Sequence, residues 1–420
     1  MIQFIIKNIL VLIVVLTQWQ LSFSQQMDYP QRLINELAGT GMQGRSNLKN
    51  GDRKAANFIK MEFEQQGIQA FGKSYFQEFM FPINTFPGTM QVTLDSAALQ
   101  PVVDFVIAPE SKSAKGTFPL IYLPQAADTI DSIYDSITTL DYSGQFVVAN
   151  LPKRQVLRSN PFNASGVIIP RKNIYWWAST GNYEANVPVF VIADSLMNLQ
   201  PTSITIDVKN QFVKKHIAKN VLGYIEGVEK PDSVVVFTAH YDHLGWMGKG
   251  NVFRGANDNA SGTAMVLWLA NHFSKPENAP NYSVAFLLFA GEESGLWGSS
   301  YFVENAVFPL NQIKALINLD MVGTGSEGIT LVNGEANTEI VEKLSLLNQA
   351  NTYFADIKVS GESCNSDHCY FHKAGVSAVF IYTRGAEFQE YHNLKDVPEK
   401  LPLTKFIELF ELLVGFTETY

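Results

Sequence analysis

Five residues of types that bind metal ions each follow a hydrophobic run or a turn in the second half of the chain, and a spare carboxylate is adjacent to one of them. Imidazole and carboxylate groups bind Zn²⁺ and similar cations, and a carboxylate that holds no metal can act as a general base. The combination predicts a two-metal hydrolase that carries its own base. The candidate ligands are His240, Asp258, Glu293, Asp320 and His392, and the spare carboxylate is Glu292.

The hydrophobic runs near these residues are typical of buried strands. They are short, rich in β-branched and aromatic residues, and bounded by turn residues. In open α/β sheets the functional groups gather beyond the carboxyl ends of the strands, so we expect side chains from separate segments to meet in one crevice. The runs are 233–239, 282–290, 314–319 and 377–382.

The spacing of apolar and turn residues changes twice along the chain. Residues 28–72 have the apolar spacing of helices, 90–213 alternate short β-like runs with turns, and the chain after 218 alternates strands with helices. A chain of 420 residues is long enough for two domains. We therefore expect an α/β domain over 25–90 and 214–420, with a mostly β domain inserted at 91–213.

The composition is that of a globular protein, with 46% hydrophobic and 17% charged residues. The net charge is -9, and the lysines and arginines form no cluster. An acidic chain without a basic patch is a poor partner for nucleic acid, so we expect none.

The first 24 residues have the pattern of a signal peptide. Lys7 precedes an apolar core at 9–16 that is too short to span a bilayer, and the small residues Ser22 and Ser24 suit cleavage after Ser24. The residue directly after Ser24 is not a cysteine, which excludes a lipoprotein anchor. We expect an exported protein, periplasmic or secreted, that leaves the membrane on cleavage; an uncleaved anchor is the alternative.

The chain has two cysteines, Cys364 and Cys369, five residues apart. In an oxidising compartment they could close a small disulfide loop. Free thiols or metal ligands remain alternatives, because so short a loop needs a particular geometry.

His240 and Asp242 are two residues apart, so at the end of an extended strand they point to the same side. One ring nitrogen of His240 could then bind metal while the other donates to the carboxylate of Asp242, which would orient the ring. A simple polar pair at a strand end is the alternative. On the same logic His243 faces away, as a structural residue or a pocket wall and not as a ligand.

Asp258 lies in a turn that opens a helix, where a lone Asp would be a cap. Beside other metal segments, a carboxylate that bridges two cations becomes the better interpretation. The adjacent pair Glu292 and Glu293 is costly after an apolar strand unless a cation or a raised pKa relieves the repulsion. This favours Glu293 as ligand and Glu292 as base, with a solvated surface pair as the alternative.

Asp320 and His392 are weak evidence when each is taken alone. Asp320 ends an apolar run with no obvious helix to cap, and His392 lies in a loop, where histidines are more often exposed than bound to metal. The prediction of a metal site therefore depends on the whole set.

Six segments in this order and spacing resemble the motif series of the co-catalytic zinc aminopeptidases. This metallopeptidase family includes bacterial leucyl aminopeptidase, aminopeptidase Y and glutamate carboxypeptidase. The resemblance implies a three-layer α/β/α domain with a mixed sheet, and the inserted module resembles a protease-associated domain. The segments are 240–242, 255–262, 291–299, 319–323, 366–368 and 391–392.

The resemblance also implies a role for each candidate residue. Two Zn²⁺ ions would be bridged by Asp258, with His240 and Asp320 completing one site and Glu293 and His392 the other. Glu292 would be the base, and a cis peptide would follow Asp258. His368 resembles a residue that lines the site without holding metal.

The chain departs from the family in one respect. Some members have a tyrosine near the segment at 366–368 that stabilises the oxyanion, but residues 362–365 include none. The metals, or another group such as Tyr382, would then take this role.

The implied function is that of an exported zinc exopeptidase, an aminopeptidase that removes N-terminal residues from peptides. Carboxypeptidase or dipeptidase activity, a one-zinc glutaminyl-cyclase-like reaction, a two-metal phosphoesterase and a non-catalytic relative are the alternatives. Four apolar residues could wall a pocket for the first side chain or simply pack, and Arg384 could grip a substrate carboxylate or form a structural ion pair. The four are Trp246, Met247, Phe253 and Trp297.

Overall fold

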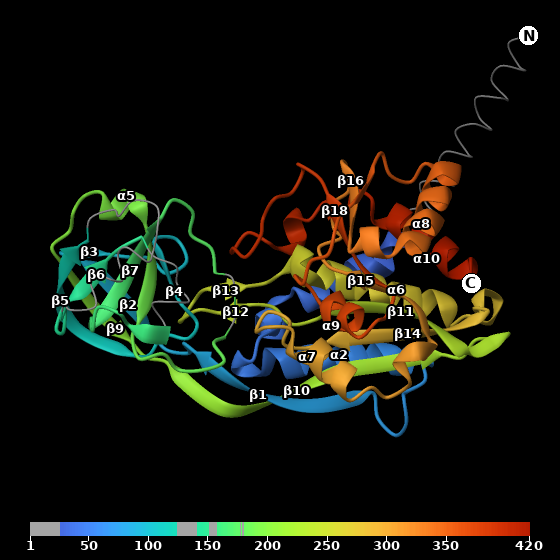
Figure 1. The fold of residues 1–420 in the computed structure, drawn as a ribbon, viewed down its shortest axis with the longest axis horizontal. Coiled ribbons are helices and arrows are strands. Elements are labelled where there is room, and N and C mark those ends of the chain that lie inside the picture. The colour runs from blue at the N-terminus through green and yellow to red at the C-terminus, as the bar shows by residue number, and fades with distance from the viewer. Residues whose placement is uncertain (1–25, 124–140, 151–157, 177, 179) are drawn as a thin grey trace, which may run out of the picture.

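The computed structural model describes residues 26–420 apart from 124–140, 151–157, 177 and 179. The described chain forms two lobes, with the β-rich middle of the sequence in one and the remaining segments in the other (Figure 1). The expected signal peptide at 1–24 lies outside the described residues. Within the part that is described, no helix combines the length and the apolar character needed to cross a membrane.

The larger lobe is built on an eight-stranded mixed sheet. β11 is parallel to both of its neighbours, β14 and β15, and β15 is parallel to β18. β1, β10 and β14 follow one another in antiparallel pairs on one side, and β16 is antiparallel to β18 on the other. The strand order is β1 (Phe76–Thr85), β10 (Gln211–Ile225), β14 (Tyr282–Phe289), β11 (Lys230–His240), β15 (Ile313–Leu319), β18 (Ala378–Arg384), β16 (Gly328–Val332) and β17 (Ile357–Val359).

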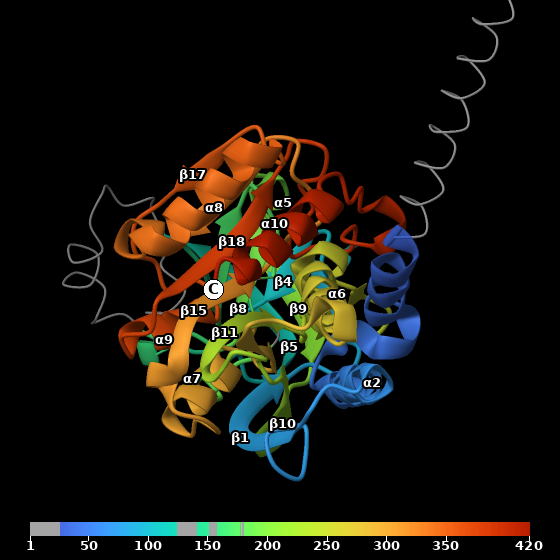
Figure 2. The same ribbon diagram turned by 90° about the vertical axis from the view of Figure 1, so that its right-hand side faces the viewer.

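Helices cover both faces of this sheet (Figure 2). The strands alternate between the two helical layers: Val235 and Phe237 of β11 pack into the first apolar core, whereas Val236 packs into the second. This period of two is what a strand buried on both faces requires. The predicted three-layer α/β/α architecture is confirmed. The first layer contains residues 26–37, α2 (Gly51–Gln66), α6 (Gly262–Phe273), α8 (Thr338–Asn351) and α10 (Phe406–Glu418), and the second α7 (Trp297–Glu304) and α9 (His368–Lys373).

In its described residues, the smaller lobe contains a second eight-stranded sheet, the short helix α5 (Asp194–Met197) and its own apolar core. Its strands lie between Met90 and Val208. All of their residues except Met90 fall within the expected insertion of 91–213. The strand order is β3 (Ala97–Ala98), β2 (Met90–Leu94), β9 (Ser203–Val208), β5 (Ala114–Tyr122), β6 (Phe146–Val148), β7 (Gly166–Arg171), β8 (Val189–Ala193) and β4 (Phe105–Ile107).

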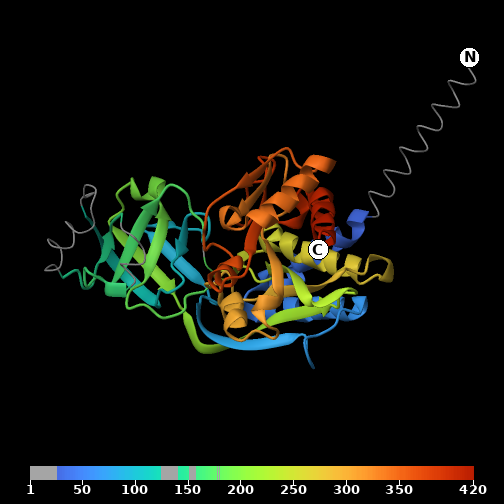
Figure 3. The same ribbon diagram turned by 45° about the vertical axis from the view of Figure 1, so that its right-hand side comes forward.

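Two long antiparallel strands, β1 and β10, connect the lobes (Figure 3). Their pairing runs to Thr85 opposite Gln211, so residues 211–213 belong to the sheet of the larger lobe. A second connection is the hairpin of β12 (Gly245–Trp246) and β13 (Val252–Phe253), which follows β11. Its residue Phe253 belongs to the apolar core of the smaller lobe. The segment that leaves the end of β11 is therefore fixed against both lobes.

Candidate active site

The candidate ligands gather at the carboxyl ends of four neighbouring strands. His240 is the last residue of β11, Glu293 follows β14 and Asp320 follows β15 directly. His392 lies in the loop after β18, and Asp258 lies in the turn Ala256–Ser261 that leads into α6. These four strands are adjacent in the sheet, and the three pairings among them are parallel, so their ends meet at one edge.

The first group of donors consists of His240, Asp258 and Asp320, all of them buried. Nε2 of His240 lies 3.4 Å from Oδ1 of Asp258 and 3.3 Å from Oδ1 of Asp320. That oxygen of Asp320 is buried and accepts no hydrogen bond from the described protein. A buried acceptor without a donor costs free energy that a cation would restore.

The second group is arranged about the other oxygen of Asp258. Nε2 of His392 lies 3.0 Å from Oδ2 of Asp258 and 3.3 Å from Oε2 of Glu293. Zn²⁺ binds nitrogen and oxygen at roughly 2.0–2.2 Å, so the edges of its coordination tetrahedron are about 3.4 Å. The donor separations in both groups, from 3.0 to 3.4 Å, fit such a tetrahedron. Asp258 thus offers one oxygen to each group.

The carboxylate of Asp242 lies closer to the main-chain N–H groups of Glu292 and Glu293 than to the ring of His240. Its carboxylate accepts from the main-chain N–H of Glu292 at 3.2 Å and of Glu293 at 3.4 Å. Nδ1 of His240 lies 3.7 Å from that carboxylate but 3.2 Å from the main-chain oxygen of Asp242. The predicted carboxylate–imidazole hydrogen bond is wrong, because β11 ends at His240 and Asp242 is no longer in an extended register.

The predicted orientation of His243 is also wrong. Its side chain is buried in the site, with Nδ1 2.7 Å from Oε1 of Glu293 and 3.8 Å from Oδ1 of Asp258. With both carboxylates it forms a group whose ligand atoms all lie within 4.8 Å of one another. The alternation of a strand does not extend to residue 243, because the chain has already turned after His240.

Burial and neighbouring charges shift the pKa of Glu292 and of His392. Burial, reinforced by Glu293 and opposed by His240, holds the pKa of Glu292 well above its ordinary value. Burial would lower the pKa of His392, but Glu293 and Asp258 outweigh it and raise that pKa to about 9. Repulsion among buried carboxylates is what divalent cations would relieve, which agrees with the spacing of the donors.

Arg45 is fully buried beneath this cluster, and no motif or spacing in the sequence singles it out. Its guanidinium donates to five main-chain oxygens. One of the acceptors is Asp258 itself, and two others, Arg254 and Gly255, precede it in the same loop. The remaining two are Leu37 and Tyr241. The side chain of Arg45 thus connects the loop of Asp258 to the end of β11 through hydrogen bonds.

Asp396 fixes the same loop from the other side. Its carboxylate accepts from the main-chain N–H of Asn257 at 2.8 Å and of Asp258 at 3.1 Å. The peptide between Asp258 and Asn259 is cis, as the resemblance implied. Asp258 is therefore held through its own N–H and its own carbonyl.

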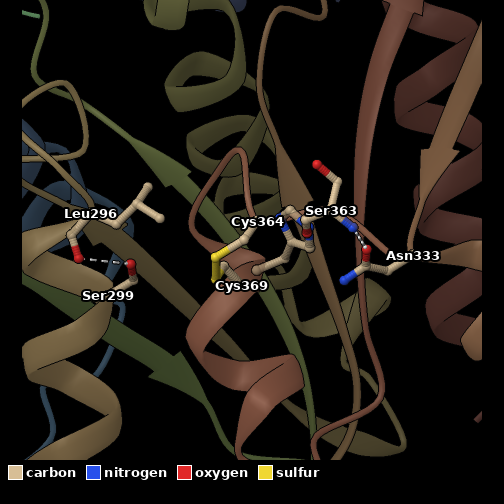
Figure 4. The surroundings of a disulfide bond; sticks show 7 residues. Leu296, Ser299, Asn333, Ser363, Cys364 and Cys369 are labelled. Atoms are coloured by element: carbon tan, nitrogen blue, oxygen red, sulfur yellow. Dashed lines mark hydrogen bonds between the residues drawn. A yellow bond between two sulfur atoms is a disulfide. The ribbon is translucent and has the colours of Figure 1, made fainter. Parts of the chain in front are cut away.

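Cys364 and Cys369 form a disulfide with their Cα atoms 4.7 Å apart, which answers the question that the sequence left open (Figure 4). The main-chain N–H of Ser363, directly before the loop, donates to the side-chain oxygen of Asn333 at 2.7 Å. Within the loop, Ser366 donates to Oδ2 of Asp320 at 2.9 Å. The loop therefore supports one of the candidate ligands.

A cavity of about 900 Å³ opens over the donors. Tyr382 and Tyr391 are in its wall, together with Phe380, Leu296 and Met321. Tyr391 was not singled out from the sequence, although it directly precedes a predicted ligand. Its ring stacks on His392 with the centroids 3.8 Å apart. Tyr391 is 47% exposed, so it is only partly buried; this partial burial and the nearby carboxylates, Asp258 first, raise its pKa above the ordinary value.

Several predicted wall residues lie elsewhere. Met247 and Phe253 pack in the core of the smaller lobe, and Lys49 lies over the ring of Trp246. Trp297 stacks on Phe81. None of these four apolar candidates is among the described residues that line the cavity.

Two other residues near the predicted site have structural contacts. Arg384 forms an ion pair with Asp356, which is the structural alternative that the sequence left open. His368 is buried against Phe380, and one of its ring nitrogens contacts the main-chain oxygen of Ser363 at 3.0 Å. His368 therefore lies behind the cavity wall.

Solved structures share this two-lobed fold. A zinc aminopeptidase from Bacillus subtilis superimposes with a TM-score of 0.70 at 20% identity, covering 92% of this chain and 93% of its own. An aminopeptidase from Aneurinibacillus gives a TM-score of 0.67 at 19% identity, covering 93% and 92%. The chain therefore has the fold of these two solved structures.

The sequence comparisons agree with the fold. A family model described as Peptidase family M28 matches residues 220–417. A probable leucine aminopeptidase of Arthroderma otae is 30% identical over 195 residues, which are 44% of this chain and 54% of that protein. Aminopeptidase YwaD of Bacillus subtilis is 30% identical over 210 residues, 47% and 44% of the two chains. This chain thus spans about half the length of these relatives.

Proposed function

We propose that the protein is a zinc-dependent aminopeptidase that holds two metal ions per chain. The observation that carries the proposal is the position of Asp258, whose two carboxylate oxygens each lie 3.0–3.4 Å from a different histidine. Each of those histidines has a further carboxylate within 3.3 Å, from Asp320 or from Glu293. One bridging carboxylate with an imidazole and a carboxylate on each side suits a pair of cations.

Zinc at these two positions would polarise the scissile carbonyl and acidify the attacking water. The protein's own part in the reaction is to place the groups that move protons. Glu292, held by the N–H contact to Asp242, takes a proton from the water and passes it to the leaving amine. Tyr391 lies in the wall of the cavity, and a tyrosine is protonated at neutral pH, so its hydroxyl can donate to the developing oxyanion. We prefer Tyr391 to Tyr382 for this role because its ring lies against His392.

The charge of the cavity favours an aminopeptidase over a carboxypeptidase. A carboxypeptidase needs a cation to bind the terminal carboxylate of its substrate. Among the described residues, no lysine or arginine lines the cavity, and Arg384 is paired with Asp356. An acidic cavity attracts the ammonium group at the N-terminus of a peptide instead.

The experiment that tests the aminopeptidase function compares aminoacyl p-nitroanilides with their N-acetyl forms, with C-terminal dipeptide substrates and with phosphate esters. Each is assayed before chelation, after chelation and after zinc is restored. We expect turnover of the free-amine substrates, loss of activity on chelation and recovery with zinc. Equal turnover of the blocked forms, or a preference for phosphate esters, would refute the proposal.

We also propose that the protein is exported after cleavage behind Ser24. The pattern of residues 1–24 supports export, and the Cys364–Cys369 disulfide suits an oxidising compartment. N-terminal sequencing of the protein from culture medium and from cell fractions should find Gln25 first. A protein that retains residues 1–24 in every fraction would contradict cleavage.

A further inference from the structure

The smaller lobe contributes to the wall of the catalytic cavity at a point close to the proposed base. Thr180 and Asn182 of that lobe line the cavity, and so do Ser294 and Leu296 of the larger lobe. The hydroxyl of Thr180 donates to the hydroxyl of Ser294 at 3.1 Å. Because Ser294 is two residues beyond Glu292, this hydrogen bond places a segment of the smaller lobe against the loop that carries the base.

This segment of the smaller lobe is anchored to a strand that connects the lobes. Gly181, between the two lining residues, and Asn84, near the end of β1, exchange two main-chain hydrogen bonds of 2.7 and 3.2 Å. A side chain at Gly181 would meet main-chain atoms of Glu110 at 2.7 Å, so the segment packs closely on the chain behind it. The buried side-chain amide of Asn84 donates to main-chain oxygens on both sides of Glu110. Asn182 is therefore carried by a well-anchored main chain.

The side chain of Asn182 is a polar group that this segment presents to the cavity. Thr180 is only 5% exposed and its hydroxyl is used in the contact with Ser294, whereas Asn182 is exposed. A carboxamide side chain offers N–H donors and a carbonyl acceptor together. A peptide group offers an acceptor and a donor in the same way, so an exposed asparagine in a cavity wall is suited to hold the main chain of a peptide.

The proposed reaction determines which part of a peptide lies near Asn182. Glu292 passes its proton to the leaving amine, so that nitrogen lies within hydrogen-bond reach of Glu292 in the bound substrate. The leaving amine belongs to the residue after the scissile bond, and consecutive Cα atoms of a peptide are about 3.8 Å apart. The residue after the scissile bond therefore lies beside the loop that follows Glu292, where the contact of Thr180 with Ser294 brings the smaller lobe.

We propose that the smaller lobe binds the substrate residue that follows the scissile bond, and that Asn182 hydrogen-bonds the peptide group on the carboxyl side of that residue. This proposal rests on the aminopeptidase function proposed above. The ligand is the peptide group itself, which Asn182 recognises whatever the side chain is. Leu296, in the adjacent wall, offers that side chain an apolar contact. The enzyme therefore prefers peptides to amino-acid derivatives that have no peptide group beyond the scissile bond.

The experiment compares the zinc-loaded full chain with its Asn182→Ala variant, which removes the carboxamide and retains the main-chain anchors. The control is Asn198→Ala, because Asn198 is an exposed asparagine at the end of α5, on the same lobe but outside the cavity lining. The substrates are leucyl-alaninamide and leucyl p-nitroanilide. They share the first residue, but only leucyl-alaninamide carries an amide group beyond the scissile bond.

The quantity that tests the proposal is the ratio of kcat/KM for leucyl-alaninamide to kcat/KM for leucyl p-nitroanilide. We expect Asn182→Ala to lower this ratio about tenfold, as the loss of two hydrogen bonds predicts, and Asn198→Ala to leave it unchanged. The proposal is overturned if Asn182→Ala lowers the ratio by less than about twofold, which is within the effect of one weak hydrogen bond, or if Asn198→Ala lowers it equally. A wild-type protein that cleaves neither substrate overturns the aminopeptidase function itself, so the two failures are distinct.

Discussion

The guanidinium of Arg45 donates a hydrogen bond, 3.3 Å long, to the main-chain oxygen of Asp258, 213 residues further along the chain. Arg45 is fully buried, and each of its other hydrogen bonds also ends on a main-chain oxygen. A buried cation beneath several carboxylates offsets part of their repulsion before any metal arrives. Arg45 thus positions the residue that both metal groups share.

Replacing this cation should therefore cost both stability and metal affinity. Arg45→Met leaves buried carbonyl groups without donors, which we expect to lower the free energy of unfolding by about 3 kcal/mol or more. Thermal melting and zinc titration of the purified variant measure the two effects. The control is Arg53→Met in α2, because Arg53 is exposed. A variant that melts and binds zinc as the wild type does would contradict the role of Arg45.

The general base can be separated from the metal ligands by mutation. Glu292→Gln retains the shape of the side chain but cannot accept the proton, so kcat should fall by two decades or more while the zinc content stays at the wild-type level. The contrasting variant is Glu293→Gln, which should lose zinc as well. The measurements are steady-state kinetics and metal analysis by mass spectrometry. Parallel loss of zinc and activity in Glu292→Gln would mean that the base is misassigned.

The bridging position of Asp258 predicts a difference in metal stoichiometry. The wild type should retain two zinc ions per chain, and Asp320→Ala should retain one, because only one group contains Asp320. Asp258→Ala should weaken both sites, since each group uses one of its oxygens. Native mass spectrometry over a series of zinc concentrations counts the ions. Equal stoichiometry in the two variants would exclude the bridge.

Because the ring of His368 is buried, we expect the folded protein to lose stability in acid. Burial lowers the pKa of His368 from its ordinary value to about 4, so the folded protein disfavours the charged ring. A histidine with a lowered pKa contributes stability above its unfolded pKa near 6.5, and that contribution is lost as the pH falls from about 6.5 to about 4. The metal-free wild type should therefore melt at progressively lower temperature across this range.

The matched variant for this prediction is His368→Gln, which has no ionisable ring. Its melting temperature should be lower than that of the wild type at pH 7.5, and the difference should shrink towards pH 4.5. Both proteins are compared after chelation, because acid also removes metal. A difference that stays constant over this range would show that His368 does not titrate as stated.

The residues of the site could be proposed from the sequence because local patterns mark the ends of buried strands. His240, Glu293 and Asp320 each end or closely follow a short apolar run that is a strand in the structure. Parallel strands bring the residues at their carboxyl ends to one edge of the sheet. We could therefore predict that these residues meet without knowing any distant contact. The two-lobed division followed in the same way, from a change in the spacing of apolar residues near 90 and 213.

The sequence could not determine how the chain continues beyond a strand end. Alternation predicts side-chain direction only while the backbone is extended, and β11 ends at His240, so the directions of Asp242 and His243 depended on the turn that follows. Residue types and spacing alone indicated a candidate metal-binding set and the strands that carry it. Only the tertiary structure decided what surrounds that set, because Arg45 contacts Asp258 from 213 residues away in the chain, through a hydrogen bond that no periodic pattern in the sequence marks.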